Sequence, residues 1–343
     1  MRPIDNPPNP FESVERQWLD EPPAVRLEVY EDRSRSILSE NDSPDLGFRW
    51  SVNPYRGCFH ACTYCYARPT HEYLGFGAGT DFESKIVVKP EAPALLRAAF
   101  ERASWRGERV VFSGNTDCYQ PLEAVWRLTR GCLEVCAEFR NPVGIITKSL
   151  LVQRDLDVLL RLHERASVRV SFSIPFADDA TGRALEPQAP LVSRRFEALR
   201  TLAAAGIPTG VSVSPVVPGL NDDDMAGILE RARDAGASWA SFMLLRLPGN
   251  VRNVFLQRLQ ATLPERARRV ENRIREVRGG ALYDARFFER QKGHGVYWEM
   301  IENQWRLHTR RLGLREEEVG IPEPTTTFRR PGAAVQASLF PEA

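Results

Sequence analysis

Residues 53–67 read Asn-Pro-Tyr-Arg-Gly-Cys-Phe-His-Ala-Cys-Thr-Tyr-Cys-Tyr-Ala, and most of what the sequence predicts depends on this run. It places three thiols, Cys58, Cys62 and Cys65, on one short loop, with no fourth cysteine close by in the sequence. A four-iron cluster normally takes four cysteine ligands, so three ligands predict a [4Fe–4S] cluster with one iron left to bind another group. The alternative is a structural zinc ion, for which His60 or His71 would supply the fourth ligand.

The composition is typical of a globular protein. The 343 residues are 43% hydrophobic and 27% charged, and they fit one large α/β domain with extensions or two smaller domains. Neither a bilayer-spanning apolar stretch nor the apolar core of a signal peptide is present, so we expect a cytoplasmic location. Six cysteines, three of them in one loop, do not resemble the framework of a secreted disulfide protein.

Positive charge is concentrated towards the carboxyl end. The formal net charge is +1, yet residues 241–315 hold 16 Lys/Arg against 7 Asp/Glu, a local charge of +9. Arginines recur along two predicted helices, at Arg266, Arg268, Arg269, Arg273, Arg275 and Arg278 and at Arg306, Arg310 and Arg311. Such a region is suited to bind a polyanion through phosphate contacts, and the alternative is a solvated arginine-rich helix face.

Short β-branched runs alternate with longer amphipathic segments from residue 48 onward. The predicted strands are Trp50–Asn53, Arg109–Ser113, Val143–Thr147, Val168–Ile174, Thr209–Ser214 and Ser238–Leu245. The predicted helices are Ala92–Ala103, Leu122–Phe139, Arg154–Arg165, Leu191–Ala205, Asp223–Ala235 and Asn253–Thr262. Six strand-then-helix units favour a parallel sheet that is closed or partly closed into a barrel.

Polar residues follow the predicted strands at their carboxyl ends. The cysteine loop follows the first strand, residues 113–117 end the second, residues 147–149 end the third, and Ser171 and Ser173 lie late in the fourth. Reactive groups of α/β barrels cluster at this end of the strands. We therefore expect these separate segments to meet at one rim.

Three stretches resemble radical S-adenosylmethionine (SAM) proteins related to spore photoproduct lyase: residues 53–58, residues 64–71 and Lys148-Ser149. The similarity covers roughly residues 45–245 and is closest to the branch labelled DNA repair photolyase-like. It implies an α/β fold, a partial (β/α)6 TIM-type barrel of the radical SAM type. We expect this core at residues 46–250, an extended N-terminal arm at 1–45, a basic helical extension at 251–315 and a flexible tail at 316–343.

The resemblance also implies a chemistry. Cys58, Cys62 and Cys65 would bind three irons of a [4Fe–4S] cluster, and SAM would chelate the fourth. An electron from the cluster then cleaves SAM to a 5′-deoxyadenosyl radical, which abstracts hydrogen from the substrate. Tyr64 and Tyr66 match tyrosines near SAM, and Tyr66 is a catalytic candidate.

Three further residues are assigned to the cofactor site by the same resemblance. Lys148 matches a lysine that contacts SAM, and a cation at the end of a strand suits a carboxylate partner. Ser149 follows it in the matching motif, and the hydroxyl of Ser173 is expected near the SAM ribose.

The sequence departs from the lyase at one position. Where the lyase has a hydrogen-donating cysteine at the end of the second strand, this chain has Gly114. Cys118 lies four residues later and is a candidate displaced hydrogen donor, the alternative being an inert buried thiol. Cys132 and Cys136 lie at i, i+4 on a predicted helix, where packing accounts for them.

We therefore predict a radical SAM enzyme, a lyase or repair-type enzyme that acts on nucleic acid and draws electrons from a reductant such as flavodoxin or ferredoxin. The alternatives are a radical SAM enzyme with a non-DNA substrate and a metal-stabilised module that binds DNA or a sliding clamp. A sliding clamp is a candidate partner because Gln336–Phe340, Gln-Ala-Ser-Leu-Phe, resembles a motif with which bacterial DNA polymerases and repair proteins bind the DNA sliding clamp.

Overall fold

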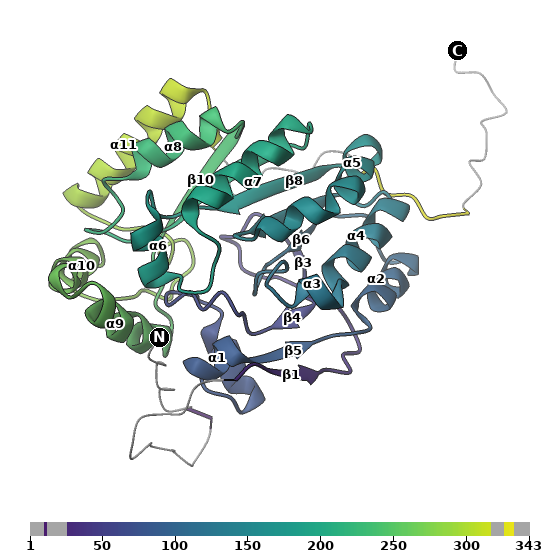
Figure 1. Ribbon diagram of the computed structural model, residues 1–343, viewed down its shortest axis with the longest axis horizontal. Coiled ribbons are helices and arrows are strands. Elements are labelled where there is room, and N and C mark those ends of the chain that lie inside the picture. The colour runs from purple at the N-terminus through teal and green to yellow at the C-terminus, as the bar shows by residue number, and fades with distance from the viewer. Residues whose placement is uncertain (1–9, 12–25, 317–325, 333–343) are drawn as a thin grey trace.

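The protein is described by a computed structural model for residues 10–11, 26–316 and 326–332, and its centre is a mostly parallel sheet with helices packed around it (Figure 1). Six parallel strands follow one another in chain order: Trp50–Val52 (β3), Val110–Phe112 (β6), Val143–Thr147 (β7), Val168–Ser173 (β8), Thr209–Val216 (β9) and Trp239–Leu244 (β10). They are the six predicted strands, with ends that differ by no more than two residues. The predicted α/β fold is confirmed.

The sheet has two edges in the described part of the chain. Leu38–Glu40 (β2) pairs antiparallel with β3 at one edge, and Arg315–Glu316 (β11) pairs parallel with β10 at the other. A second sheet of three strands, in the order β1-β5-β4, is formed by Glu28–Glu31, Lys85–Val88 and Tyr55–Arg56. Strands β1, β2 and β5 are not predicted from the sequence, and two of them lie in the predicted N-terminal arm.

Helices connect the strands of the large sheet. The longer ones are Ala92–Glu101 (α2), Leu128–Glu138 (α4), Leu156–Arg165 (α5), Val192–Ala204 (α7) and Met225–Asp234 (α8). Each buries an apolar stripe, as α5 does with Val158, Leu159 and Leu162. Three shorter helices are Thr80–Ser84 (α1), Glu123–Trp126 (α3) and Asp179–Leu185 (α6). No helix of the described residues has the length and apolar character needed to cross a membrane.

The predicted helix Leu122–Phe139 is wrong in one respect, because the chain breaks it into α3 and α4. Arg127, between them, has a φ of 53°, in the left-handed region. The cause is the buried carboxylate of Glu123, which accepts hydrogen bonds from the backbone amides of Thr129 and Arg130 at 2.9 and 3.2 Å. This carboxylate caps the start of α4, a function that the periodicity of apolar residues does not reveal.

The C-terminal extension is helical, as predicted. It consists of Val251–Thr262 (α9), Pro264–Val277 (α10) and Val296–Leu312 (α11), and α11 packs against α8. Many of its arginines face acids, for example Arg275 with Glu271 at 2.8 Å and Arg311 with Glu230. The positive charge of the region is therefore partly neutralised within the chain.

Part of the predicted flexible tail packs on the core. Residues 326–332 run past the loops that follow α2 and α4, and the ring of Phe328 is only 8% exposed. It stacks on Phe139, with the ring centres 6.0 Å apart, and fits where Gly107 leaves room, because a Cβ there would lie 2.2 Å from the Phe328 Cβ. Composition alone marks this stretch as unstructured, whereas the Phe328 ring and hydrogen bonds such as that from the Arg329 amide to the Phe139 carbonyl oxygen anchor it. The motif at Gln336–Phe340 lies outside the described residues.

Candidate active site

A cavity of about 860 Å³ lies against one face of the large sheet. Small polar side chains of β8, β9 and β10 form much of its wall: Ser171, Ser173, Ser212, Ser214 and Ser241. Side chains of this size leave the space open, so that Ile146 on β7 is 38% exposed although it belongs to a central strand. The cysteine loop, residues 113–117 and Lys148 line the same cavity, so the predicted convergence on one rim is confirmed for these segments.

Hydrogen bonds and close packing fix the backbone of the cysteine loop. Arg68 is fully buried and donates from Nε and Nη2 to the carbonyl oxygen of Cys62 at 3.0 and 2.9 Å. Gln120 donates from Nε2 to the carbonyl oxygen of Gly57 at 3.0 Å. Gly57 has a φ of 76°, and a Cβ there would lie 2.8 Å from His71, so the turn into the loop requires glycine.

The three sulfurs of the loop are sheltered. Cys58 and Cys62 are 7% and 8% exposed, Cys65 is half-buried, and all three line the cavity. Burial raises the pKa of each thiol, that of Cys62 to about 12, so a cation must stabilise them as thiolates. In the described segments no group of three or more His, Cys, Asp or Glu side chains lies close enough to hold a single metal ion.

A buried charged cluster lies beside the loop. Glu186 accepts hydrogen bonds from the Tyr64 hydroxyl and from Arg195, and its carboxylate is 3.8 Å from the Lys148 Nζ. Burial alone would raise the pKa of Glu186, but Arg195 and Lys148 outweigh burial and lower it. Burial would likewise lower the pKa of Lys148, yet the Cys62 sulfur and Glu186 raise it. The lysine is thus held as a cation at the cavity.

A second carboxylate, that of Asp117, connects several segments that line the cavity. Asp117 accepts hydrogen bonds from the Thr147 hydroxyl at 2.7 Å and the Lys148 backbone amide at 2.8 Å, and it lies 3.3 Å from Nδ1 of His60. Burial would raise the pKa of Asp117, but His60 and these hydrogen bonds lower it to about 2. The ends of β6 and β7 and the cysteine loop are therefore tied together by one ionised group.

Comparison with known proteins decides the family. The sequence matches the radical SAM superfamily over residues 52–232, more than half of the chain and the part that contains the cysteine loop. The chain belongs to the radical SAM superfamily. The match ends within α8, so β10 and the C-terminal helices lie beyond it.

Relatives of this radical SAM chain span different organisms. Uncharacterized proteins of Mycobacterium tuberculosis and Mycobacterium bovis are 39% identical over 222 residues, which are 64% of this chain and 65% of theirs. The chain thus matches slightly less than two thirds of the length of these relatives. A protein of Pseudomonas phage M6 described as a radical SAM Nalpha-GlyT isomerase is 26% identical over 64% of this chain and 46% of its own.

Solved structures share the fold. Spore photoproduct lyase complexed with dinucleoside spore photoproduct superposes with a TM-score of 0.59 at 18% identity, covering 84% of this chain and 81% of the lyase. A mutant of the same lyase with bound SAM and dinucleoside spore photoproduct gives a TM-score of 0.56, with the same identity and coverage. At this identity the similarity is one of fold.

Most residues predicted for the radical SAM site lie at the cavity. Besides the three cysteines, the cavity is lined by Tyr64, Tyr66, Lys148 and Ser173. The Tyr66 hydroxyl donates to the carbonyl oxygen of Gly114 at 2.8 Å. Desolvation raises the pKa of Tyr66 to about 12, further above the neutral range in which a phenol already keeps its proton. The roles of these side chains toward a cofactor stay predictions.

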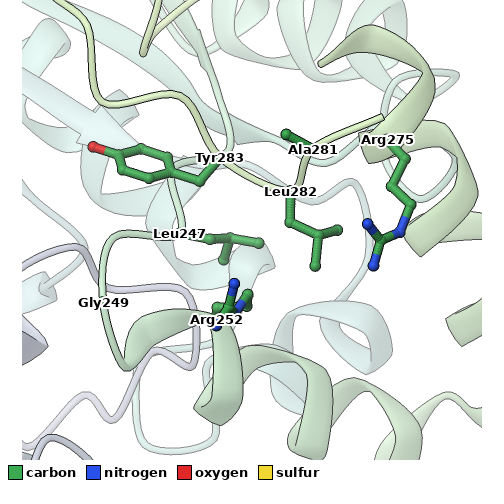
Figure 2. A pocket seen from close by; sticks show the side chains of 7 residues that line it. All are labelled: Leu247, Gly249, Arg252, Arg275, Ala281, Leu282 and Tyr283. Atoms are coloured by element: carbon green, nitrogen blue, oxygen red, sulfur yellow. The ribbon is translucent and has the colours of Figure 1, made fainter. Parts of the chain in front are cut away.

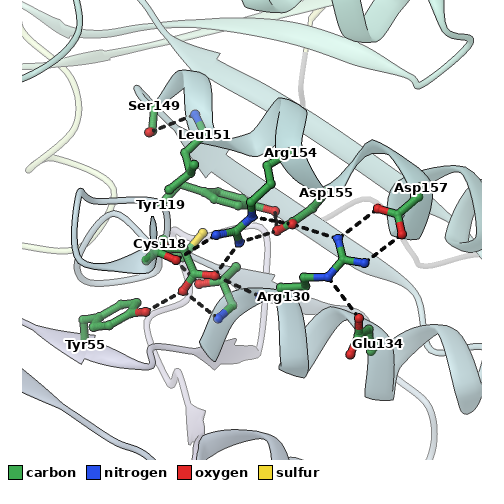
Figure 3. A network of polar contacts seen from close by, with 12 residues as sticks. Tyr55, Cys118, Tyr119, Arg130, Glu134, Ser149, Leu151, Arg154, Asp155 and Asp157 are labelled. Atoms are coloured by element: carbon green, nitrogen blue, oxygen red, sulfur yellow. Dashed lines mark hydrogen bonds and ion pairs between the residues drawn. The ribbon is translucent and has the colours of Figure 1, made fainter. Parts of the chain in front are cut away.

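Two predicted site residues are not among those lining the cavity. Cys118 is fully buried in the hydrophobic core, and Figure 3 shows it next to the network around Tyr55, Arg130, Arg154 and Asp155. Ser149 caps the 3₁₀ helix Leu150–Asp155 by accepting a hydrogen bond from the Leu151 amide at 3.2 Å. Cys118 and Ser149 each directly follow a residue that lines the cavity, Asp117 and Lys148, but do not line it themselves.

Gly114 leaves no room for a side chain. A Cβ at this position would lie 2.8 Å from the Cβ and 3.1 Å from the Oγ of Ser51 on β3. The absence of a thiol at the end of β6 is therefore built into the packing of β3 against β6. A cysteine would fit only if Ser51 moved.

Several residues that organise this site carry little signal in the sequence. Arg68 directly follows the quoted run, and its place beside the cysteine loop is the one readable hint of its role. Glu186 and Arg195 follow β8 on separate segments, and nothing in their local sequence distinguishes them from surface charges. They are buried together only as a result of the tertiary fold.

Proposed function

We propose that this chain is a radical SAM enzyme in which Cys58, Cys62 and Cys65 hold a [4Fe–4S] cluster and which acts on nucleic acid. The observation that carries the proposal is that the three sulfurs line one cavity of about 860 Å³ together with Tyr66 and the Lys148 cation. A volume of this size is in the range of small-molecule and cofactor sites.

The donor set suits an iron–sulfur cluster. Three thiols on one loop, all facing one space, match a cluster with one iron left for a second ligand, and positive charge close to the sulfurs favours their anionic form. When bound, the cluster supplies the electron that cleaves SAM to methionine and a 5′-deoxyadenosyl radical. Arg68 and Gln120 hold the loop backbone in place for it.

The protein residues have separate tasks around the cofactor. Lys148 offers a cation to the SAM carboxylate, and Glu186 holds the position of that cation through a contact of 3.8 Å. Tyr66 presents a protonated phenol at the cavity wall, and the serines of β8 and β9 offer hydroxyl groups to the ribose or the substrate.

Nucleic acid is favoured as the substrate class by two supports. The lyase with the same fold was solved with a dinucleoside photoproduct, and the helical extension carries excess positive charge beside the large sheet. Gly114 argues for a reaction different from that of a lyase that relies on a cysteine at this place. We therefore propose repair-type or lyase chemistry without a thiol donor at the end of β6.

Anaerobic reconstitution tests the proposal. Loading with iron and sulfide should give about four irons per chain, and addition of SAM and dithionite should release 5′-deoxyadenosine, measured by liquid chromatography and mass spectrometry. A protein that takes up zinc but no iron, or that releases no 5′-deoxyadenosine, contradicts the radical SAM assignment. Single-stranded DNA, ultraviolet-irradiated duplex DNA, RNA and a peptide pool, compared in the same assay, separate nucleic acid from the other substrate classes.

The clamp hypothesis needs its own test. Full-length protein and a variant lacking residues 336–340 are compared for association with a bacterial sliding clamp by surface plasmon resonance. We expect the deletion to abolish binding while leaving iron content unchanged, because the deleted segment contains none of the cysteines. Equal binding by both proteins would refute a role for this pentapeptide.

Assays with flavodoxin and ferredoxin identify the electron donor.

A further inference from the structure

Two aromatic side chains of the large cavity meet at Gly114, at the end of β6. A Cβ at Gly114 would lie 3.6 Å from Cε2 of Phe48, and the Tyr66 hydroxyl donates to the Gly114 carbonyl oxygen at 2.8 Å. Both rings line the cavity; Phe48 is half-buried and Tyr66 is 43% exposed. Two flat apolar surfaces from separate segments of the chain are therefore offered at one part of the wall.

The loop that carries Phe48 is fixed to the other side of the molecule. Asp45 is only 3% exposed and accepts a hydrogen bond from Nε of Arg290 at 2.7 Å. Gln291 donates from Nε2 to the carbonyl oxygen of Asp45 at 3.0 Å. The Phe48 ring is thus presented on an ordered backbone, which reduces the entropy lost when a ligand packs against it.

A cation lies beside Tyr66 on the same wall. Arg246 lies two residues beyond the end of β10, lines the cavity, and has its Cζ 5.2 Å from the centre of the Tyr66 ring. The next residue, Leu247, lines a separate cavity of about 400 Å³ with Arg252 and Tyr283 (Figure 2). Adjacent residues thus face different cavities, and Arg246 belongs to the large one.

Arg246 has hydrogen-bonding capacity that the protein does not use. Its Nε is buried and has no hydrogen-bond partner among the described residues. The acids that line the cavity, Asp45, Asp117 and Glu316, accept hydrogen bonds from other side chains. A buried donor of a cation that lacks a partner is costly, so Arg246 is suited to receive an anion.

We propose that Phe48, Tyr66 and Arg246 form the subsite for one nucleotide of a nucleic-acid strand, with the base stacked on Phe48 and the phosphate bound by Arg246. Direct contacts join these groups, because only Gly114 and Tyr66 lie between the Phe48 ring and the guanidinium group. Aromatic faces and cations are the features with which proteins hold single strands. Lys148, the cation proposed for the SAM carboxylate, is a different group, so Arg246 is left for the substrate. The inference rests on the proposed function and names the residues that hold its substrate.

The test uses two matched probes, thymidine 5′-monophosphate and thymidine, which differ only in the phosphate. Dissociation constants are measured by ligand-observed NMR on the iron-loaded full chain. Saturating SAM is present without a reductant, so that the SAM site is filled and no cleavage occurs. We expect the wild type to bind the monophosphate about tenfold more tightly than thymidine, as for one charge-assisted hydrogen bond.

The two ends of the subsite should respond separately. Arg246→Gln should bind both probes equally, with the thymidine affinity of the wild type. Phe48→Leu should weaken both probes about fivefold, because stacking on the base is lost, and should leave their ratio unchanged. Arg315→Gln is the matched control and should change neither value. Arg315 also lines the cavity, but it pairs with Trp239 at the beginning of β10, whereas Arg246 follows the end of that strand.

Four results would overturn the inference. The wild type may bind the two probes equally, Arg246→Gln may keep the wild-type ratio, or Arg315→Gln may lower this ratio as much as Arg246→Gln does. The fourth is a loss of SAM affinity in Arg246→Gln, measured by equilibrium dialysis, with an unchanged ratio, which would assign Arg246 to the SAM carboxylate. Circular dichroism of each variant confirms that the fold is retained.

A longer probe distinguishes a strand from a free nucleotide. An oligothymidylate of about four nucleotides offers further phosphates and should bind more tightly than the monophosphate. It should lose affinity in Arg246→Gln and in Phe48→Leu as the monophosphate does. Equal affinity of the two probes for the wild type would assign the subsite to a free nucleotide and overturn its use for a strand.

Failure here and failure of the proposed function have different signatures. Binding of the probes requires no SAM cleavage, so a protein that shows the expected changes but releases no 5′-deoxyadenosine loses only the radical SAM assignment. A protein that releases 5′-deoxyadenosine and binds thymidine as tightly as its monophosphate loses only the nucleotide subsite.

Discussion

The two sets of cysteines in this chain have opposite surroundings. Cys58, Cys62 and Cys65 line the large cavity, whereas Cys118, Cys132 and Cys136 are fully buried in the hydrophobic core and do not line it. Burial raises the pKa of the thiols in both sets, so acidity does not separate them. What separates the two sets is access to a shared open space. We therefore expect changes on the cavity side to alter chemistry and changes on the core side to alter stability.

The largest contrast is expected between Cys58→Ala and Cys132→Ala. The first removes a proposed cluster ligand and should abolish iron retention and release of 5′-deoxyadenosine. The second removes one buried sulfur and should cost about 1 kcal/mol of unfolding free energy with the iron retained. Iron analysis and urea denaturation measure both effects. Loss of iron in Cys132→Ala to the same extent would remove the distinction between the two sets.

The next effect belongs to the core side. Phe328→Ala should lower the free energy of unfolding by about 3 kcal/mol, because the ring stacks on Phe139 and fills the space over Gly107. Release of 5′-deoxyadenosine should stay unchanged below the unfolding temperature. Arg329→Ala serves as the control, since its backbone amide makes the contact with Phe139 and survives the change. Equal stability of Phe328→Ala and the wild type would show that residues 326–332 do not anchor the chain.

Gly114 lies at the border of the two regions. Gly114→Ala should destabilise the protein by about 2 kcal/mol, because its Cβ would lie 2.8 Å from that of Ser51. The double variant Gly114→Ala/Ser51→Gly should recover most of this loss in urea denaturation. If the single variant is as stable as the wild type, β3 and β6 have room to move apart, and a cysteine would fit there too.

A smaller effect on the cavity side concerns the cofactor alone. Lys148→Met should weaken SAM binding about tenfold, as expected for one charge-assisted hydrogen bond of roughly 1.5 kcal/mol. Glu186 keeps Arg195 as its partner, so the fold should persist. Lys85→Met, which removes a lysine paired with Asp81 outside the cavity, is the control for equilibrium dialysis. Unchanged SAM affinity would take Lys148 out of the cofactor site.

The smallest effect is expected for Cys118→Ala. The side chain does not line the cavity, so release of 5′-deoxyadenosine and turnover of any identified substrate should stay within about twofold of the wild type. A large loss of product formation with normal cleavage of SAM would restore Cys118 as a hydrogen donor, reached by a movement of residues 113–118. The comparison of the two cysteine sets would then fail for this residue.

The family and the frame of the site can be read from the order of residues along the chain. The spacing of Cys58, Cys62 and Cys65 is local, and the alternation of strands and helices is a repeated local pattern, so both are visible without knowledge of distant contacts. The position of Lys148 followed from a rule about strand ends. Features of this kind need no information about packing.

Which residues share a space depends instead on how the chain folds back on itself. Asp117 lines the cavity and Cys118 does not, and Lys148 lines it and Ser149 does not, because adjacent residues point in different directions. The partnership of Glu186 with Arg195, the break at Arg127 and the burial of Phe328 arise from contacts that the local sequence pattern does not show. Burial and charge pairing are properties of the folded environment, and no local pattern encodes them.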